Sequence, residues 1–143
     1  MGKSSYEELE KELKELKNSD IRPLKEDHYK NFFDNMSEMV EVIELIYDKN
    51  NQPIDFYIRA INTSFAKFLG KTKKQLVNKK VSSVVDKIEE NWFTSFAKVD
   101  KTGEPLRFKN YGAAFDKYYF VSVWKVSKKN IGISFTDITK SER

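Results

Sequence analysis

The sequence predicts an α+β domain in which a five-stranded antiparallel sheet carries helices on one face, preceded by an N-terminal amphipathic helix. Two segments rich in β-branched and aromatic residues lie within residues 40–61, and three more follow residue 106. Helical patterns fill the interval between the two groups. Strands grouped at both ends of a chain, with helices between them, are typical of α+β domains with a single sheet.

The composition excludes several classes of site. The 143 residues suffice for one domain with an additional element, and 39% hydrophobic residues can supply its core. Without cysteine there are no disulfides, thiolate nucleophiles or cysteine-ligated metals, and the single histidine, His28, excludes a multi-histidine metal site. No apolar run approaches the roughly 20 residues that span a bilayer, and a net charge of +4 does not by itself indicate a nucleic-acid partner. We therefore expect a cytoplasmic fragment without membrane or nucleic-acid contacts.

The first 26 residues predict an amphipathic helix and a linker. Within residues 5–17, apolar side chains recur at spacings of three, four and three on a background of Glu and Lys: Tyr6, Leu9, Leu13 and Leu16. This is a two-heptad seam, and a helix of this length needs a docking surface to be stable in water. A second copy of the chain or an uncovered patch of the following domain could provide that surface. A solvated linker helix is the alternative.

The segment from residue 27 to residue 61 predicts a short helix followed by a hairpin. Asp27 is placed to cap the helix. Residues 40–47 and 54–61 are rich in β-branched and aromatic residues, and the turn formers between them end at Pro53. We therefore expect two antiparallel strands here.

Capping patterns predict two short helices after the hairpin. Asn62 is placed as an N-cap, and Gly70 can end the first helix in the left-handed conformation. Thr72 with Gln75 matches a capping box for another helical turn. Residues 82–86 are expected to form a short connection.

The remaining chain predicts one longer helix and three strands. The helix covers residues 88–101 and ends at Gly103 and Pro105. The strands are expected at residues 106–115, 118–126 and 130–136. The middle strand is apolar on both faces, so each face needs to pack against another element. One face is expected to pack on the domain's own core, and the other on the N-terminal helix or a second subunit. The residues expected at this dimer or helix-docking contact are Tyr6, Leu9, Leu13, Leu16, Phe120 and Trp124.

The last strand is followed at once by helix-forming polar residues. Ile131, Ile133 and Phe135 alternate with small or polar residues, as in a strand with one buried face. After residues 137–139, residues 140–143 begin a charged helix. An ordinary domain seldom ends where a helix begins. We therefore interpret the chain as a module of a longer protein, whose output leaves through this exit.

Several short motifs occur in a characteristic order over more than a hundred residues. They are Phe33-Asp34-Asn35-Met36-Ser37-Glu38, Tyr47-Asp48 before the Pro53 turn, Ile61-Asn62 with Phe65 and Phe68-Leu69-Gly70, Thr102-Gly103-Glu104-Pro105-Leu106-Arg107-Phe108, and Asp137-Ile138-Thr139. In this order, residues 31–139 resemble a PAS domain of bacterial and archaeal sensor proteins of the sensor histidine kinase type. The expected domains are an N-terminal helix and linker over 1–26, a PAS domain over 27–139, and the start of an exit helix over 140–143.

The resemblance implies a regulatory input domain that is not itself an enzyme. Such domains lie upstream of histidine kinases, cyclic-dinucleotide enzymes, chemoreceptors or further sensor domains. In them the Asp of the terminal motif connects the sheet to the outgoing helix, and Asp137 and Thr139 match these signal-relay positions. An Asp at the start of a helix also caps its free N–H groups. A plain N-cap without a signalling role would have the same sequence.

No cofactor is predicted, although an unknown small molecule is possible. The resemblance implies that a flavin-adduct sensor needs a cysteine after the second strand, and that a haem sensor usually has a histidine on the long helix. Neither residue is present. An apolar cavity beneath the sheet could hold a ligand, or the same aromatic residues could fill it as core. The candidate pocket residues are Phe93, Phe96, Phe108, Tyr111, Tyr119, Val121, Ile133 and Phe135.

The expected function is a sensory domain that relays small-molecule or partner binding to an effector domain in the same polypeptide, acting as a homodimer. A constitutive homodimerisation module with a filled core and no ligand is the alternative. A small enzyme is disfavoured because the chain has no cysteine, no glycine-rich phosphate loop and no convincing pair of carboxylates. Nucleic-acid binding through the lysines of residues 71–80 lacks a recognised motif.

Overall fold

The computed structural model describes residues 7–12, 25–86, 88, 90–112 and 116–142. The chain divides into two compact units, Met1–Phe32 and Phe33–Arg143. In the first unit, residues 7–12 are helical and include Leu9, whereas the other predicted seam residues, Tyr6, Leu13 and Leu16, lie outside the described residues. The helix α2 (Glu26–Asn35) leads into the second unit.

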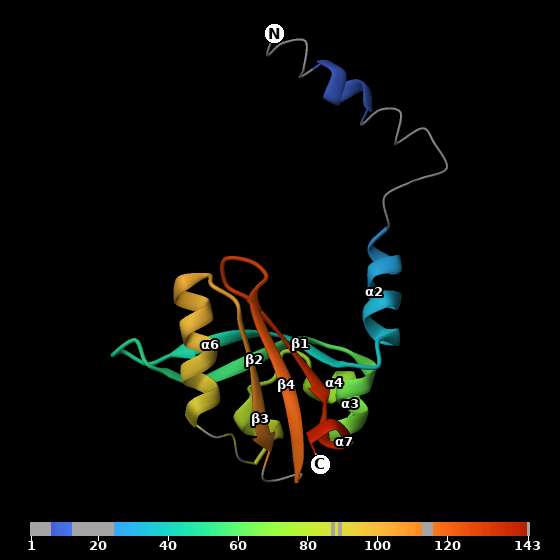
Figure 1. Cartoon of the computed structure of the whole chain (residues 1–143). Helices are drawn as coiled ribbons and strands as arrows, with labels where there is room; N and C mark the ends of the chain where they lie inside the picture. The colour runs from blue at the N-terminus through green and yellow to red at the C-terminus, as the bar shows by residue number, and fades with distance from the viewer. Residues whose placement is uncertain (1–6, 13–24, 87, 89, 113–115, 143) are drawn as a thin grey trace. The chain divides into compact units, whose positions relative to one another are not determined.

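A five-stranded antiparallel sheet forms the second unit, which confirms the predicted fold class (Figure 1). Its strands are β1 (Met39–Tyr47), β2 (Pro53–Ile61), β3 (Leu106–Gly112), β4 (Lys117–Lys125) and β5 (Ile131–Asp137). The spatial order is β2-β1-β5-β4-β3, so the last strand in sequence occupies the centre of the sheet. β5 pairs with β1 on one side and with β4 on the other. The N-terminal hairpin and the C-terminal strands are therefore joined through β5.

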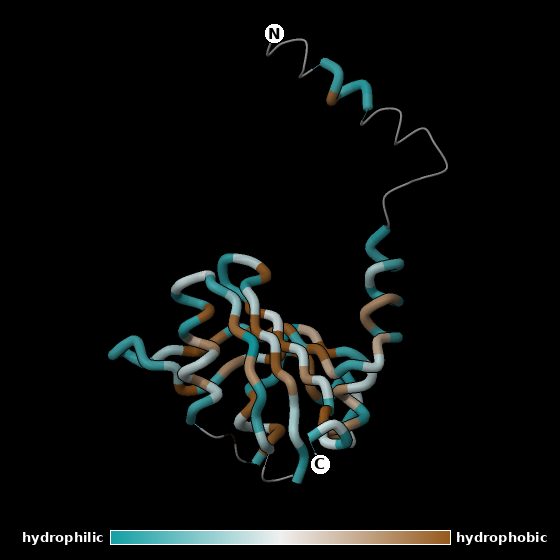
Figure 2. Tube along the Cα trace, viewed as in Figure 1, coloured by the Kyte–Doolittle hydropathy of each residue, from teal (hydrophilic) through white to brown (hydrophobic). Residues whose placement is uncertain are grey.

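Helices pack on one face of this sheet and enclose the core. They are α3 (Thr63–Leu69), α4 (Lys73–Leu76), α5 (Val81–Val84) and α6 (Glu90–Thr102), and a fifth, α7 (Thr139–Glu142), follows β5. The core contains side chains of the sheet face and of the helices, among them Ile43, Ile58, Val121, Val123, Ile133, Phe65, Leu76, Phe96 and Val99. Figure 2 shows hydrophobic residues concentrated along the strands and hydrophilic residues in the turns.

The predicted capping residues end and begin the short helices as expected. The Asn62 side chain accepts a hydrogen bond from Phe65 N, and Gly70 adopts a left-handed conformation with φ of 70°. The Thr72 and Gln75 side chains form a reciprocal capping box at the start of α4. These interactions involve residues within one helical turn, which is why the sequence alone reveals them.

One helix was not expected. The predicted connection at residues 82–86 overlaps α5, in which Val85 N donates a hydrogen bond to the carbonyl oxygen of Val81. Val81 is buried in the core. Its burial stabilises a helical turn that the β-branched residues of this segment do not favour locally.

Two element boundaries also differ from the prediction. α2 begins at Glu26, so Asp27 lies in its first turn and does not cap the helix. The third strand ends at Gly112, and the rest of its predicted extent, residues 113–115, lies outside the described residues. Asp116 has a φ of 50°, which is typical of a tight turn, and β4 begins directly after it.

The sequence of β4 alternates between the two faces of the sheet as predicted. Tyr119, Val121 and Val123 are buried against the helices, while Phe120 and Trp124 lie half-buried on the opposite, outer face. On this face the Trp124 ring packs over the backbone of Gly132 in β5. A Cβ atom added at Gly132 would lie 2.5 Å from the Trp124 ring, so only glycine permits this close packing.

Candidate functional site

The exit from the sheet is held by a small network of polar contacts. Asp137 Oδ1 accepts a hydrogen bond from Thr139 N at 2.9 Å, and Asp137 Oδ2 lies 3.6 Å from Lys117 Nζ. The Thr139 hydroxyl accepts a hydrogen bond from Tyr118 N at 2.9 Å. The two predicted relay residues thus lie together and connect β5, β4 and the start of α7.

This network stabilises the charged form of Asp137. Hydrogen bonds from Thr139 are the main cause that lowers the pKa of Asp137 below its ordinary value, and the Lys117 ammonium lowers it further. Asp137 is about half exposed, so solvent screens these interactions. The carboxylate therefore remains ionised at neutral pH and available as an acceptor.

The short helix α7 and the residue before it are also attached to strands β4 and β3. Ile138 N donates a hydrogen bond to the carbonyl oxygen of Tyr118 at 2.9 Å. Lys109 of β3 forms an ion pair with Glu142 at 2.8 Å. Contacts with β3, β4 and β5 therefore hold the segment from Ile138 to the end of α7.

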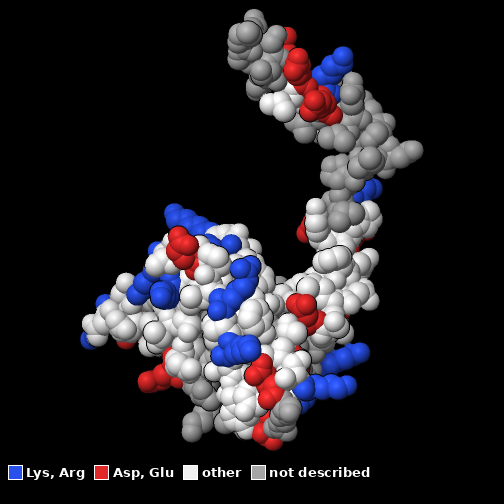
Figure 3. Space-filling view, in the orientation of Figure 1, with Lys and Arg blue, Asp and Glu red and all other residues white. Residues whose placement is uncertain are grey.

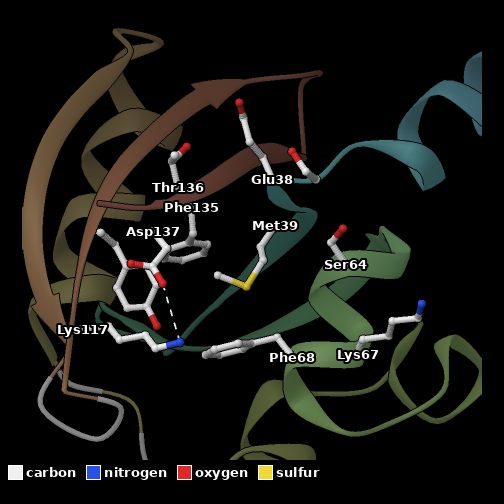
Figure 4. Close-up of a pocket in the computed structure, with 11 residues that line it drawn as sticks. Glu38, Met39, Ser64, Lys67, Phe68, Lys117, Phe135, Thr136 and Asp137 are labelled. Carbon is white, nitrogen blue, oxygen red and sulfur yellow. Dashed lines mark ion pairs between the residues drawn. The ribbon is translucent and has the colours of Figure 1, made fainter. Parts of the chain in front are cut away.

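A cavity of about 530 Å³ opens beside the same network (Figure 4). It lies between α3, the start of β1, the start of β4 and the end of β5. Apolar walls come from Met39, Phe68 and Phe135, and Lys117 and Asp137 close one side as an ion pair (Figure 4). A volume of this size is within the range of small-molecule sites.

Only part of the predicted pocket lines this cavity. Tyr119 and Phe135 do so, and Asp137, predicted as a relay residue, joins them. The other candidates lie elsewhere: Phe96, Val121 and Ile133 are fully buried in the core, and Phe93 and Phe108 pack against it. Tyr111 is 42% exposed, and its hydroxyl donates a hydrogen bond to Asp116. The structure therefore brings two of the eight candidates to the cavity.

Close aromatic packing occupies the region where the remaining candidates meet. The Trp92 ring lies 5.9 Å from Phe96, 5.9 Å from Phe108 and 5.5 Å from Phe135, measured between ring centroids. Phe56 contributes further contacts with Phe93 at 5.9 Å and Phe96 at 6.0 Å. Such tilted and edge-to-face contacts are typical of a packed aromatic core.

Eight of the eleven residues that line the cavity were not predicted as site residues, among them Met39, Phe68 and Lys117. Met39 and Phe68 have the pattern of ordinary core residues, and nothing in their local sequence distinguishes them. Lys117 lies between the strands predicted at residues 106–115 and 118–126. Its place two residues before Tyr119 was a usable signal, because alternate residues of a strand share a face.

The side of the molecule shown in Figure 3 has no single extended basic face. On the side shown in Figure 3, Lys and Arg side chains form separate groups with acidic side chains between them. Within the lysine-rich segment of residues 71–80, Lys73 forms an ion pair with Asp34. Among the residues that the structure describes, no helix combines the length and the apolarity needed to cross a membrane.

Comparison with known proteins gives matches at the level of structure. No family model and no curated protein matches the sequence. A domain of an HTR-like protein from Haloarcula marismortui ATCC 43049 has a TM-score of 0.55 at 18% identity, covering 73% of this chain and 100% of that one. The PAS domain of nitrogen regulation protein NR(II) from Vibrio parahaemolyticus has a TM-score of 0.55 at 12% identity, covering 77% and 97%.

A third solved structure extends the same likeness. A domain of the sensory box sensor histidine kinase/response regulator from Geobacter sulfurreducens has a TM-score of 0.52 at 13% identity, covering 78% of this chain and 92% of that one. At such low identities the shared feature is the arrangement of the strands and helices. The sheet order, the helices on one face and these matches together show that residues 33–142 have the fold of a PAS domain, as the sequence resemblance predicted.

Proposed function

We propose that residues 33–142 form a non-enzymatic sensory domain, in which occupancy of the cavity is relayed through β5 to α7 and then to an effector domain such as a histidine kinase. One observation carries this proposal. Asp137 lines the cavity and also accepts the hydrogen bond from Thr139 N at the start of α7. A molecule in the cavity would therefore contact the residue that holds the exit helix. The names of the similar structures, which include a sensor histidine kinase, support a regulatory role.

The coupling required for such a role is small. A free energy of about 1–3 kcal/mol between a ligand site and an output element is enough for regulation. Within the described part of the chain, the polar contacts that hold α7 are few: the Asp137 and Thr139 hydrogen bonds, the backbone bond of Ile138, and one exposed ion pair. Exposed hydrogen bonds and short helices belong to the least stable parts of a fold. α7 can therefore respond to a modest change at Asp137.

Replacing Asp137 with alanine is expected to loosen α7 without unfolding the sheet. The substitution removes the acceptor for Thr139 N and the partner of Lys117. Amide hydrogen exchange, measured by NMR, should become about tenfold faster at residues 139–142, because loss of one such contact corresponds to about 1 kcal/mol or slightly more. Amides in the centre of β5 should retain their protection. In the full-length protein, the same substitution should uncouple the output from the input.

Glu104→Ala provides the matched control, since Glu104 is an exposed carboxylate in the turn after α6. It should leave exchange at residues 139–142 unchanged. Unchanged exchange in Asp137→Ala as well, or a full-length Asp137→Ala protein that signals normally, would show that Asp137 is not the relay.

A constitutive homodimerisation module is the second candidate, favoured by the aromatic residues on the outer face of β4. Phe120 and Trp124 lie there half-buried, on the side of the sheet opposite the core. If this face forms the dimer, Phe120→Lys should raise the dimer dissociation constant at least tenfold, measured by sedimentation equilibrium. Deletion of residues 1–20 should then leave the dimer intact. If the dimer is lost when residues 1–20 are deleted but not in Phe120→Lys, the contact belongs to the N-terminal helix. A wild-type chain that is monomeric would reject this candidate.

A further inference from the structure

The cavity contains a buried polar group that the fold itself does not satisfy. The Tyr119 side chain is only 5% exposed, and its hydroxyl has no hydrogen-bond partner among the residues that the structure describes. Tyr119 also lines the cavity. A buried hydroxyl without a partner costs about 1–3 kcal/mol, so folded proteins rarely retain one without a reason. The described part of the fold supplies no acceptor for this hydroxyl, so an acceptor brought by a ligand would satisfy it.

The ring of Tyr119 is held in place by its neighbours. Its centroid lies 6.5 Å from that of Phe68 and 6.2 Å from that of Phe135, in edge-to-face contacts. On the β3 side, the position of Gly112 lies directly against the ring, since a Cβ atom there would be 3.1 Å from it. These contacts fix the orientation of the Tyr119 ring and therefore the position of its hydroxyl. Burial is the main cause that raises the pKa of Tyr119, so the hydroxyl keeps its proton at neutral pH.

A positive charge lies on the same strand as Tyr119. Lys117 and Tyr119 are alternate residues of β4, and Tyr119 pairs in register with Asp137 of β5. Lys117 Nζ is 3.6 Å from the Asp137 carboxylate, which is longer than the roughly 2.8 Å of a tight charge-assisted hydrogen bond. The Lys117 side chain is 45% exposed, so its ammonium can accommodate a second anionic oxygen.

The other charged residues of the lining are oriented differently. The side-chain ends of Glu38 and Lys67 point away from Met39 and Phe68 (Figure 4). The charge that faces the apolar walls is therefore that of the Lys117–Asp137 pair. This pair is neutral overall and both side chains are about half exposed, so the unpartnered Tyr119 hydroxyl, a hydrogen-bond donor, is what favours an incoming carboxylate over an incoming ammonium.

We propose that the cavity binds a small organic anion with an apolar body, such as an aromatic or short-chain monocarboxylate. Its carboxylate pairs with Lys117 and accepts a hydrogen bond from the Tyr119 hydroxyl, while its body packs against Met39, Phe68 and Phe135. Binding draws Lys117 away from Asp137 and so alters the contacts at the start of α7. The assignment of this ligand class rests on the proposed sensory function.

Titration with benzoate, benzamide and benzylamine tests the proposal, because the three probes share a ring and differ in charge. Amide chemical shifts of the whole chain, followed by NMR, give both the affinity and the place of binding. Benzoate should bind saturably and shift residues 38–39, 67–68, 117–119 and 135–137. Benzamide should bind about tenfold more weakly, and benzylamine more weakly still. Equal affinities for the three probes, or shifts confined to other residues, would overturn the proposal.

Two variants and one matched control separate the contributions. Lys117→Met should weaken benzoate about tenfold and leave benzamide unchanged, because only the ion pair is lost. Tyr119→Phe keeps the ring and removes the hydroxyl, so it should weaken both probes several-fold. Lys74→Met, on an exposed lysine of α4 that does not line the cavity, should change neither affinity. Equal effects of Lys74→Met and Lys117→Met would indicate general attraction by surface charge and contradict the assignment.

The ligand class and the sensory function fail in different ways. If benzoate binds as predicted but hydrogen exchange at residues 139–142 does not change, the relay is wrong and the ligand class stands. If benzamide or benzylamine binds at least as tightly as benzoate and alters that exchange, the ligand class is wrong and the relay stands.

Discussion

Replacing Asn62 with alanine is expected to lower the free energy of unfolding by about 3–4 kcal/mol, since the Asn62 side chain joins three parts of the fold. Its Oδ1 atom accepts hydrogen bonds from Val40 N at 3.1 Å and Phe65 N at 3.2 Å, and its Nδ2 atom donates to the carbonyl oxygen of Glu38 at 2.8 Å. The side chain is completely buried. Alanine removes a helix cap, leaves the buried Val40 N of β1 without this acceptor, and removes the donor to Glu38 O just before β1.

Urea unfolding of several variants at position 62 can separate the contribution of the helix cap from that of the contacts with Val40 and Glu38. Asn62→Ser keeps a capping oxygen for α3 but is too short to satisfy Val40 N and Glu38 O, so it should fall between wild type and Asn62→Ala. Asn50→Ala, at an exposed turn position, should change the free energy of unfolding by less than about 0.5 kcal/mol. A loss below 1 kcal/mol in Asn62→Ala would contradict the central role of this side chain.

Replacing Glu41 with methionine is expected to stabilise the protein by about 3 kcal/mol at pH 7. Glu41 is 5% exposed and faces the core, paired in register with Ile61 and Ile133. Among the residues that the structure describes, none forms a hydrogen bond or ion pair with its carboxyl group. Burial raises the pKa of Glu41 from 4.5 to about 8, so the folded protein holds this carboxyl protonated at pH 7. Each pH unit above the ordinary pKa costs about 1.4 kcal/mol.

The same residue gives the wild-type protein a defined dependence on pH. Between pH 4.5 and about 8 the unfolded chain releases the Glu41 proton while the folded protein retains it, so stability falls as the pH rises. The stability difference between Glu41→Met and wild type should therefore grow by about 1.4 kcal/mol per pH unit from pH 5 to pH 8 and become constant above that. Urea unfolding at four pH values measures it.

Glu44→Met is the control for this series. Glu44 lies on the same strand, but its side chain is about one third exposed and forms an ion pair with Arg59 at 3.2 Å. Its substitution leaves Glu41 in place, so the fall in stability between pH 5 and pH 8 should persist in this variant. Parallel pH profiles for Glu41→Met and wild type would show that the Glu41 carboxyl ionises normally in the folded protein.

Local patterns in the sequence predicted the elements well, because the interactions that define them are local. Period-two alternation located β5, a run of residues apolar on both faces located β4, and the caps at Asn62 and Thr72 depend on residues within one turn. α5 was missed since its stability comes from burial of Val81 against distant residues. The same limit explains why Asn62 was recognised as a cap but not as a link to β1.

The cavity could not be located from sequence, because four separate segments meet there. Phe68 and Phe135 contribute rings that would suit a core equally well, and only the folded chain shows that they leave space between them. The burial of Glu41 was partly foreseeable. Glu41 and Glu44 have opposite parity on one strand, so one of the two carboxylates had to face the core.

Both tryptophans of the chain touch the central strand β5, from opposite sides of the sheet. Trp124 covers Gly132 on the outer face, and the Trp92 ring lies 5.5 Å from Phe135 on the inner face. Indole emission depends strongly on its immediate surroundings. The intrinsic fluorescence of this chain is thus a built-in optical reporter of strand position, which needs no attached dye and can follow motion of β5 in real time.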